Sequence, residues 1–321
     1  MALVPHTPVL LDRVVALLAD APDGVVVDGT IGAGGHARAV LEARLERYGR
    51  AELVGLDRDP DAIELAGARL GELRFDERVT IELVRARFDA LPDVLDARGT
   101  PRVSGILLDL GLSSMHVDRP ERGFSYRADG PLDMRMDPDL PTTAGELVDA
   151  LDERALASLL RRYADEPHAG RIARAIVAAR PITSTVHLAE VVRDAVPAAA
   201  RRRGGHPATR TFQALRIAVN AEIEALEALL PSVVERLSPG GVAVVIAYHS
   251  LEDRPVKRAF AAAAAGCVCP PGLPICACGH TPEVEHLVRR PERPSPDEVT
   301  ANPRASSARL RAVRRLPEEP S

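Results

Sequence analysis

Short runs of consecutive apolar residues alternate along the chain with longer segments in which apolar residues recur every three or four positions. The short runs predict buried strands and the longer segments predict amphipathic helices. The predicted strands span residues 25–28, 53–57, 79–84, 105–110 and 242–247, with 284–289 and 310–313 as the last strands. Because helix-length segments separate the first four, the pattern indicates an α/β fold with a doubly wound, Rossmann-like parallel sheet.

The alternation of strands and helices stops between residues 110 and 242, about 130 residues that exceed any ordinary crossover connection. Helical spacing continues there over residues 143–151, 153–163, 171–179, 188–196 and 211–230. A helix over residues 221–237 is expected to belong to the sheet domain again and to pack before the fifth strand. We therefore expect an inserted helical domain over residues 118–214, with residues 1–117 and 215–321 forming the sheet domain.

The first predicted strand ends in Asp28 and leads into a glycine-rich turn, Gly29-Thr-Ile-Gly-Ala-Gly-Gly-His36. Glycines let the backbone turn sharply and lie close to a ligand, which a Cβ would block. A carboxylate at Asp28 would repel the pyrophosphate of a dinucleotide, which such a turn otherwise binds at a helix N-terminus. A cofactor with an ammonium and a sulfonium group would be attracted instead, so the turn predicts a site for S-adenosylmethionine.

Three further residues follow strands on the same predicted edge of the sheet. Asp57 ends the second strand, where a carboxylate accepts hydrogen bonds from both ribose hydroxyls. Phe88 follows the third strand and either covers the adenine face or packs in the core. Asp109 ends the fourth strand, and it is either a turn or cap residue or the catalytic acceptor for the protons of an exocyclic amine. As such an acceptor, Asp109 would direct the nitrogen lone pair toward the methyl group. Alignment of the nitrogen, the methyl carbon and the sulfur would supply the remaining part of the catalysis.

The segment 248–254 follows the fifth predicted strand and places His249 directly beside Ser250. Adjacent side chains of an extended segment point to opposite sides, so a hydrolytic His–Ser dyad is not expected. We interpret the segment as one that positions the substrate.

All four cysteines lie close together, at Cys267, Cys269, Cys276 and Cys278. Four thiols can build a tetrahedral zinc site, but the C-x-C spacing differs from the usual C-x₂-C. A reduced surface loop explains the same residues, because disulfides are disfavoured in the cytoplasm. We therefore assign no metal ligand.

Basic residues are concentrated in one part of a mildly acidic chain. The net charge is −5, yet residues 154–216 hold twelve arginines against four acids, a balance of +8 that leaves about −13 elsewhere. Such asymmetry indicates a surface that meets nucleic-acid phosphates, although a solvated helical surface has the same composition. The sequence has no signal region and no membrane-length apolar run, so we expect a cytoplasmic protein without a membrane partner.

Together these motifs resemble the bacterial 16S rRNA (cytosine-N4)-methyltransferases of the RsmH, or MraW, family. The similar segments are residues 6–11, 28–36, 109–114, 121–125, 129–137, 206–216, 249–253 and 302–304. The resemblance implies a class I S-adenosylmethionine-dependent methyltransferase fold. It also implies methylation of a decoding-site cytidine of 16S rRNA within the small ribosomal subunit, with the helical insert recognising the substrate.

The resemblance also assigns residues to the cofactor. It places contacts at Gly34, Gly35, His36, Asp57, Phe88 and Asp109. His116 stands where the family usually has a glutamine, and we carry the cofactor contact over to it. An imidazole donates or accepts where an amide does both, so His116 would make a different contact.

Three other functions stay open at this point. A DNA amino-methyltransferase shares the cofactor argument, but it usually carries an Asp/Asn-Pro-Pro-aromatic signature that is missing after Asp109. A Rossmann dehydrogenase is disfavoured by Asp28, and a non-catalytic RNA-binding module would use the glycine turn only structurally. The oligomeric state is also open, with a homodimer among the expectations.

Overall fold

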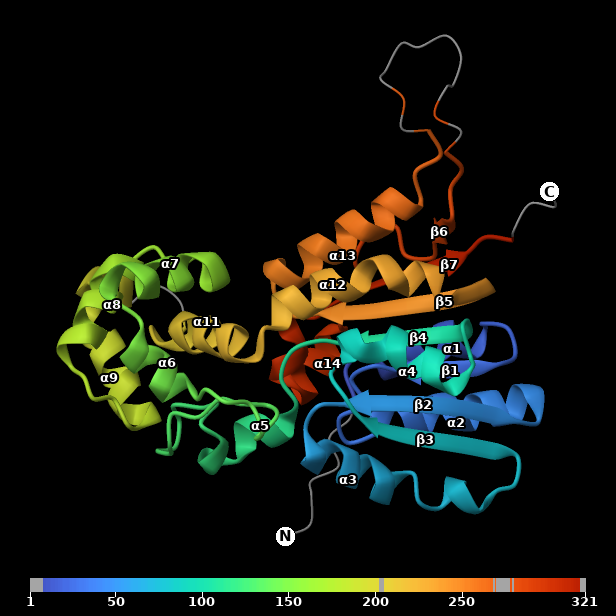
Figure 1. The fold of residues 1–321 in the computed structure, drawn as a ribbon, viewed down its shortest axis with the longest axis horizontal. Helices are drawn as coiled ribbons and strands as arrows, with labels where there is room; N and C mark the ends of the chain where they lie inside the picture. Colours follow the sequence, from blue (N-terminus) through green and yellow to red (C-terminus); the bar gives the residue numbers. More distant parts are fainter. Residues whose placement is uncertain (1–7, 202–204, 268, 270–277, 279, 318–321) are drawn as a thin grey trace. The chain divides into compact units, whose positions relative to one another are not determined.

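The computed structural model describes residues 8–201, 205–267, 269, 278 and 280–317 (Figure 1). Backbone contacts divide the chain into two compact units, which are described separately below. The first unit comprises Met1–Gly111 with Glu224–Ser321, and the second comprises Leu112–Ile223. From the sequence we predicted the borders of the helical domain between residues 117 and 118 and between residues 214 and 215.

Within the described residues of the first unit, seven strands form one sheet in the order β3-β2-β1-β4-β5-β7-β6 (Figure 1). The strands are β1 (Val25–Asp28), β2 (Ala51–Asp57), β3 (Val79–Arg85), β4 (Val103–Asp109), β5 (Leu237–Ala247), β6 (Val284–His286) and β7 (Arg309–Arg315). Strands β1 to β5 are parallel, and β7 runs antiparallel to both β5 and β6. The strand order reverses between β1 and β4, the point at which open α/β sheets bind ligands.

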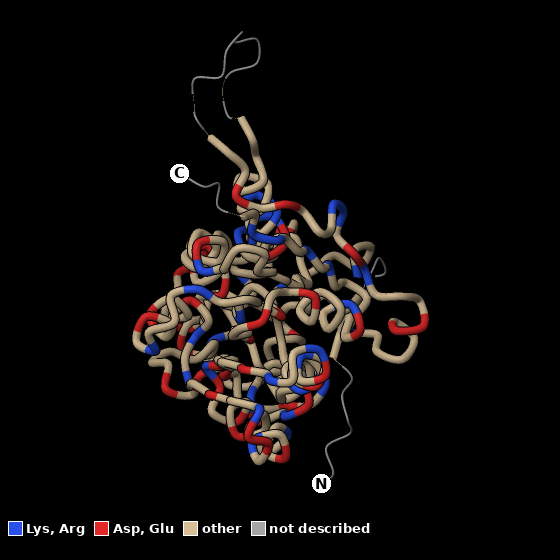
Figure 2. The backbone as a smooth tube through the Cα atoms, turned by 90° about the vertical axis from the view of Figure 1, so that its right-hand side faces the viewer, with Lys and Arg blue, Asp and Glu red and all other residues tan. Residues whose placement is uncertain are grey.

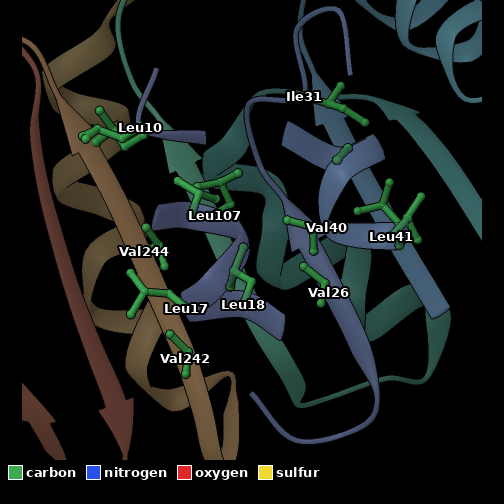
Figure 3. Packing of buried hydrophobic residues seen from close by; sticks show 14 of the residues in the cluster. Leu10, Leu17, Leu18, Val26, Ile31, Val40, Leu41, Leu107, Val242 and Val244 are labelled. Carbon is green, nitrogen blue, oxygen red and sulfur yellow. The ribbon is translucent and has the colours of Figure 1, made fainter. Parts of the chain in front are cut away.

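Helices cover both faces of this sheet. They are α1 (Leu11–Ala19), α2 (Gly35–Tyr48), α3 (Pro60–Arg69), α4 (Leu91–Arg98), α12 (Glu222–Glu235), α13 (Ser250–Ala263) and α14 (Pro296–Ala301). Short 3₁₀ turns lie at η1 (Leu73–Phe75), η2 (Phe88–Ala90) and η4 (Pro303–Ser307). Val26 of β1 packs with α1, α2 and α3 on one face (Figure 3), whereas its neighbour Val27 packs with α4, α12 and α13 on the other. Since successive strand residues point to opposite faces, the all-apolar strands of the sequence fill both layers.

Arg44 fixes the entry into β1. Its side chain lies on α2, it is 1% exposed, and its guanidinium donates to the following acceptors. These are the carbonyls of Leu18, Ala21, Pro22 and Gly24 and the hydroxyl of Ser104. Both Nη atoms therefore have acceptors, whereas the buried Nε has no hydrogen-bond partner within the described residues. The bonds of the Nη atoms tie the α1–β1 connection to α2 and β4.

The second unit is helical. It contains α5 (Ser114–Asp118), η3 (Pro120–Arg122), α6 (Ala144–Ala150), α7 (Glu153–Ala164), α8 (Ala169–Ala178), α9 (Thr185–Ala195), α10 (Ala198–Arg201) and α11 (Thr209–Asn220). Its separate core includes Leu156 and Leu160 of α7, Ile172 of α8 and Leu188 of α9. The apolar spacing of these helices therefore buries one face of each, as the sequence predicted.

The helical segment predicted over residues 211–230 is divided into two helices, and the helix predicted over residues 221–237 corresponds to α12. Helix α11 ends at Asn220 and α12 begins at Glu222, with Ala221 in a left-handed conformation at φ 48°. The side chain of Asn220 donates to the carbonyl of Met134 and accepts from the amide of Met136. These contacts with a distant segment accompany the break, although the apolar pattern runs on through it.

None of the described helices has both the length and the apolar character that crossing a bilayer requires.

Candidate active site

Three neighbouring strands of the first unit end in an aspartate. Asp28, Asp57 and Asp109 are the last residues of β1, β2 and β4. In the parallel register, Asp28 pairs with Gly55 of β2 and with Leu107 of β4. Asp57 and Asp109 thus lie two residues beyond it on either side, and all three carboxylates meet at the carboxyl edge of the sheet.

The glycine-rich turn lies between these strand ends and is fixed to both neighbouring strands. The amide of Gly29 donates to the carbonyl of Leu107 at 2.9 Å, and that of Ile31 donates to the carbonyl of Leu56 at 2.9 Å. Gly34 has φ 74°, and it is the N-cap of α2. A Cβ on Gly35 would lie 2.5 Å from the ring of Pro8. The backbone conformation at Gly34 and the close approach at Gly35 both require glycine.

Asp28 is buried beneath this turn, with 2% of its surface exposed. It accepts a hydrogen bond from the amide of Thr30 at 3.1 Å. Burial raises the pKa of its carboxyl to about 8, and the negative charges of Asp109 and Asp57 push it in the same direction. The site is therefore electrostatically prepared for positive charge, which would stabilise the ionised form of Asp28.

Asp57 is held in place by backbone amides through both of its oxygens. The amide of Gly32 donates to Oδ2 and that of Asp59 donates to Oδ1, each at 3.0 Å. Both donors are backbone amides, so they fix the carboxylate relative to the main chain of the glycine-rich turn and of the β2–α3 connection. The turn and the carboxylate expected to bind ribose are thus one rigid element.

Asp109 is at the centre of a second set of contacts. Tyr248, directly after β5, donates its hydroxyl to Oδ1 at 2.9 Å, and Nδ1 of His36 lies 3.6 Å from Oδ2. The amide of Asp109 donates to the hydroxyl of Thr30 at 2.7 Å. Burial and the charge of Asp109 raise the pKa of Tyr248, so its hydroxyl stays protonated and remains a donor.

His36 links this aspartate to the N-terminal segment. The ring is 6% exposed, and its Nε2 lies 2.9 Å from the carbonyl oxygen of Val9. Because a carbonyl only accepts, Nε2 carries a proton and donates. His36 therefore lies between Val9 and Asp109 and fixes the orientation of α2 relative to the end of β4.

Phe88 begins η2 after β3 and is 8% exposed. Its ring packs in the core on the α4 face of the sheet, and the guanidinium of Arg58 lies 5.9 Å from the ring centroid. Core packing is thus one function of Phe88, and contact with an adenine remains a prediction. His116 lies in the second unit, on α5, where its buried ring is 4.8 Å from that of Phe124. Its contact with a cofactor also remains a prediction.

The segment 248–254 contributes to the site mainly by shaping it. Oε2 of Glu252 accepts the backbone amide of Tyr248 at 2.7 Å, and Oε1 lies 3.0 Å from Nε2 of His249. Asp253 accepts from the guanidinium of Arg311 on β7 at 2.6 Å, which with the charge of that arginine lowers its pKa against the effect of burial. Both acids are buried and stabilise the β5–α13 junction, which places Tyr248 beside Asp109.

Acidic and basic residues are interspersed along the backbone (Figure 2). In residues 154–216, two arginines serve the fold of the second unit: Arg180 donates to helix-end carbonyls and Arg216 pairs with Glu222 at 2.7 Å. Eight others among the described residues are exposed, namely Arg154, Arg161, Arg162, Arg171, Arg174, Arg193, Arg201 and Arg210. Arg202 and Arg203 lie outside the described residues.

The sequence matches the model of the MraW methylase family over residues 3–316. The chain belongs to this family. It is 54% identical over 319 residues to a ribosomal RNA small subunit methyltransferase H of Acidothermus cellulolyticus, covering 98% of this chain and 94% of that one. It is 49% identical over 315 residues to the protein of the same name from Heliobacterium modesticaldum, covering 97% and 98%. The structure of an rRNA methylase from Streptococcus thermophilus aligns over 98% of this chain and all of its own, with a TM-score of 0.43 and 11% identity.

Membership of the MraW methylase family confirms that the chain is a methyltransferase with a Rossmann-like sheet, and that S-adenosylmethionine is its cofactor. The carboxylates and glycines of the first unit fit such a cofactor, because the buried Asp28 and the half-buried Asp57 and Asp109 lie around a turn in which added Cβ atoms would clash. Sequence reasoning missed the hydrogen bonds of Thr30 and Tyr248 to Asp109. The signals for them in the sequence were that Tyr248 directly follows a predicted strand and that Thr30 lies in the glycine-rich turn.

Proposed function

We propose that the chain transfers a methyl group from S-adenosylmethionine to the N4 amine of a decoding-site cytidine of 16S rRNA, within the small ribosomal subunit. One observation carries this proposal: Asp28, Asp57 and Asp109 converge around the glycine-rich turn, and the hydroxyl of Tyr248 donates a hydrogen bond to Asp109. The names of relatives that are about half identical over nearly the whole chain support the rRNA substrate.

Each part of the cofactor has a matching group in the proposed site. Gly34 and Gly35 would let it approach the backbone, Asp57 would accept the ribose hydroxyls, and Phe88 would contact the adenine. Asp28 and Asp109 would face its cationic portion, since both contribute to the negative potential of the turn. His36 would act through Asp109, and the cofactor contact that the resemblance assigns to His116 stays a prediction.

Asp109 is the residue we propose as catalytic. When bound, S-adenosylmethionine supplies the methyl group, and transfer joins the methyl carbon to N4 while the carbon–sulfur bond breaks. The lone pair of N4 is delocalised into the cytosine ring, so an acceptor for its protons is needed to direct it. Asp109 would accept one N4 proton in a hydrogen bond and take it up as the new bond forms. Tyr248 would hold the carboxylate in place while this happens.

The exposed arginines of the second unit are proposed to bind the rRNA backbone. Each phosphate contact releases condensed counterions, so affinity should fall steeply with salt. A stacked cytosine could not reach the end of β4, so we propose that the target base turns out of its stack. Small subunits occur in the cytoplasm, where we propose that the enzyme acts, and assembly as a homodimer stays a prediction that sedimentation would check.

Methyl transfer to three acceptors tests the reaction: assembled small subunits lacking the modification, naked 16S rRNA and duplex DNA. We expect label in N4-methylcytidine from small subunits only. Asp109→Ala should lower kcat by about 100-fold or more, as loss of a proton acceptor does, and it should also weaken the binding of S-adenosylmethionine, because Asp109 is proposed to face the cationic portion of the cofactor. Asp109→Asn keeps an acceptor for Tyr248 and isolates the charge. Equal labelling of DNA, or unchanged turnover of Asp109→Ala, would contradict the proposal.

Charge reversal tests the rRNA surface separately. Arg161→Glu combined with Arg171→Glu alters two exposed residues of α7 and α8. We expect weaker binding to small subunits and a slope of log K against log salt that is shallower by about one per lost contact. Arg74→Glu, the same change on an exposed residue of η1, is the matched control and should leave the slope unchanged.

A further inference from the structure

Three of the cysteines gather at the two ends of a long connection in the first unit. Helix α13 ends at Ala263 and β6 begins at Val284, so twenty residues separate them. The amide of Glu283 donates to the carbonyl of Ala263 at 2.8 Å, which brings the two ends of the connection together. Cys267 and Cys269 lie on the segment that leaves α13, and Cys278 lies on the segment that returns to β6.

The sulfur atoms of these three residues are close to one another in space. The Sγ atoms of Cys267 and Cys278 are 3.8 Å apart, and the three Sγ atoms all lie within 4.8 Å of each other. Sulfurs bound at about 2.3 Å to a tetrahedral Zn²⁺ lie about 3.8 Å from one another. We propose that Cys267, Cys269 and Cys278 bind a thiophilic divalent ion, Zn²⁺, which closes this connection.

Neither hydrophobic burial nor a disulfide explains this clustering. Cys267 and Cys278 are exposed and Cys269 is only half-buried, so removal of apolar surface from water does not bring the thiols together. A disulfide needs its sulfurs about 2.05 Å apart, far less than the 3.8 Å between Cys267 and Cys278. Three ligands to one ion satisfy all the distances at once.

A long connection also gains from such an ion. Cross-linking its two segments would lower the conformational entropy of the unfolded chain, and this effect grows with the length of the connection. Three thiolates leave one tetrahedral position for a fourth donor. Cys276, the remaining cysteine of the sequence, lies outside the described residues. The site is separate from the aspartates of the sheet edge and does not depend on the methyl-transfer proposal.

Metal analysis of the full-length, untagged protein purified under reducing conditions tests the proposal. We expect about one equivalent of Zn²⁺ per chain, and replacement by Co²⁺ should give the visible bands of tetrahedral thiolate coordination. Cys267→Ser and Cys278→Ser should each reduce bound Zn²⁺ to about a tenth or less, because metal affinity depends on the number of thiolates. Gly266→Ser is the matched control, since a side chain there meets no atom within 4 Å and no thiol is lost.

Two further measurements separate metal loss from misfolding and from oxidation. The cysteine variants should bind S-adenosylmethionine with unchanged affinity, and a chelator should lower the Tm of the wild type but not that of Cys278→Ser. Titration of thiols in denaturant without reductant should find all of them reduced. A wild-type protein that takes up no Zn²⁺ or Co²⁺, a Cys278→Ser variant that keeps full metal, or a Cys267–Cys278 disulfide would overturn the proposal.

Discussion

The most direct test of the cofactor site is the proton on Asp28. Its carboxyl is 2% exposed at the end of β1, and burial raises its pKa to about 8. In the ligand-free protein at pH 7, only about a tenth of the molecules would therefore have an ionised Asp28. A cationic ligand favours the ionised form, so binding should expel the proton. We expect the wild type to release close to one proton more per ligand at pH 7 than Asp28→Asn does, since asparagine has no proton to lose.

The affinity should depend on pH in the same way. If the ligand binds the ionised form, the apparent Kd is divided by the competent fraction and weakens by up to about tenfold for each pH unit below 8. Calorimetric titration of S-adenosylmethionine from pH 6 to 9, in buffers of different ionisation enthalpy, gives both the Kd and the number of protons released. The ligand's own amino group titrates in this range, but it cancels in the ratio of the Kd of Asp28→Asn to that of the wild type.

Asp23→Asn is the matched control, because it makes the same chemical change just before β1, at the opposite edge of the sheet. The hydrogen bond from Arg50 lowers the pKa of Asp23, so this residue is ionised throughout the range and should not contribute to proton release. The reasoning about Asp28 is refuted if the wild type and Asp28→Asn release the same number of protons and show the same dependence of Kd on pH.

Protonation of Asp28 weakens the binding of the cofactor, but it stabilises the folded state of the ligand-free protein. An aspartate in the unfolded chain has a pKa near its ordinary value of 3.8, whereas the pKa of Asp28 in the folded chain is about 8. Between these values the folded state binds the extra proton, so the free energy of unfolding falls as pH rises, by about 1.4 kcal/mol per unit. Asp28→Asn should remove this decline, and urea unfolding at pH 5 and pH 8 would measure it.

Four further substitutions test the site and the fold of the first unit. Tyr248→Phe removes the donor to Asp109, and we expect single-turnover methyl transfer to slow by about tenfold while the Kd for S-adenosylmethionine changes by less than about threefold. Gly34→Ala, at φ 74° and with its Cβ 3.3 Å from the α3 backbone, should weaken cofactor binding in addition to costing about 1–2 kcal/mol. Gly99→Ala, at φ 71° in open space, should lower stability in urea but leave binding unchanged. Arg44→Met would leave buried carbonyls without their donor and should cost about 3 kcal/mol or more in a urea titration.

The centre of the sheet was largely predictable because β1, β4 and the second half of β5 are almost entirely apolar and buried on both faces. Residues 25–28 form β1 as predicted, but β5 starts at Leu237 rather than at residue 242. Pro239, Gly240 and Gly241 are typical of a turn in the sequence. In the structure they lie within the strand, where the pairing with β4 shifts between Val103 and Gly105. A β-bulge accommodates the irregular residues, and only the neighbouring strand reveals it.

The aspartates at the strand ends could be located from the sequence because each ends an apolar run. The contacts that their side chains make could not be predicted in this way. Tyr248 and Asp109 are 139 residues apart, and they meet only because β5 lies next to β4 after the helical unit. Nothing in the local sequence specifies that adjacency. Likewise, Glu252 and Asp253 have the residue types of catalytic acids, but their partners are backbone amides, His249 and Arg311, which stabilise the junction. The pattern of apolar and polar residues predicts which polar residues end a strand. The pairing of strands in the folded protein determines which contacts those residues make.

Asp28 also changes how the preference for a cation is explained. A fixed negative charge on Asp28 would repel a pyrophosphate, as we predicted from the sequence. The raised pKa of Asp28 instead leaves its carboxyl mostly neutral at pH 7 in the ligand-free protein. A neutral Asp28 would repel an anion only weakly, so selectivity cannot rest on its static charge. It rests on linkage: a cation lowers the pKa of Asp28 and gains a charge partner, whereas an anion raises it further and gains none. Asp57 and Asp109, which help to raise that pKa, make this difference larger, and the discrimination between cofactors becomes a property of all three strand ends.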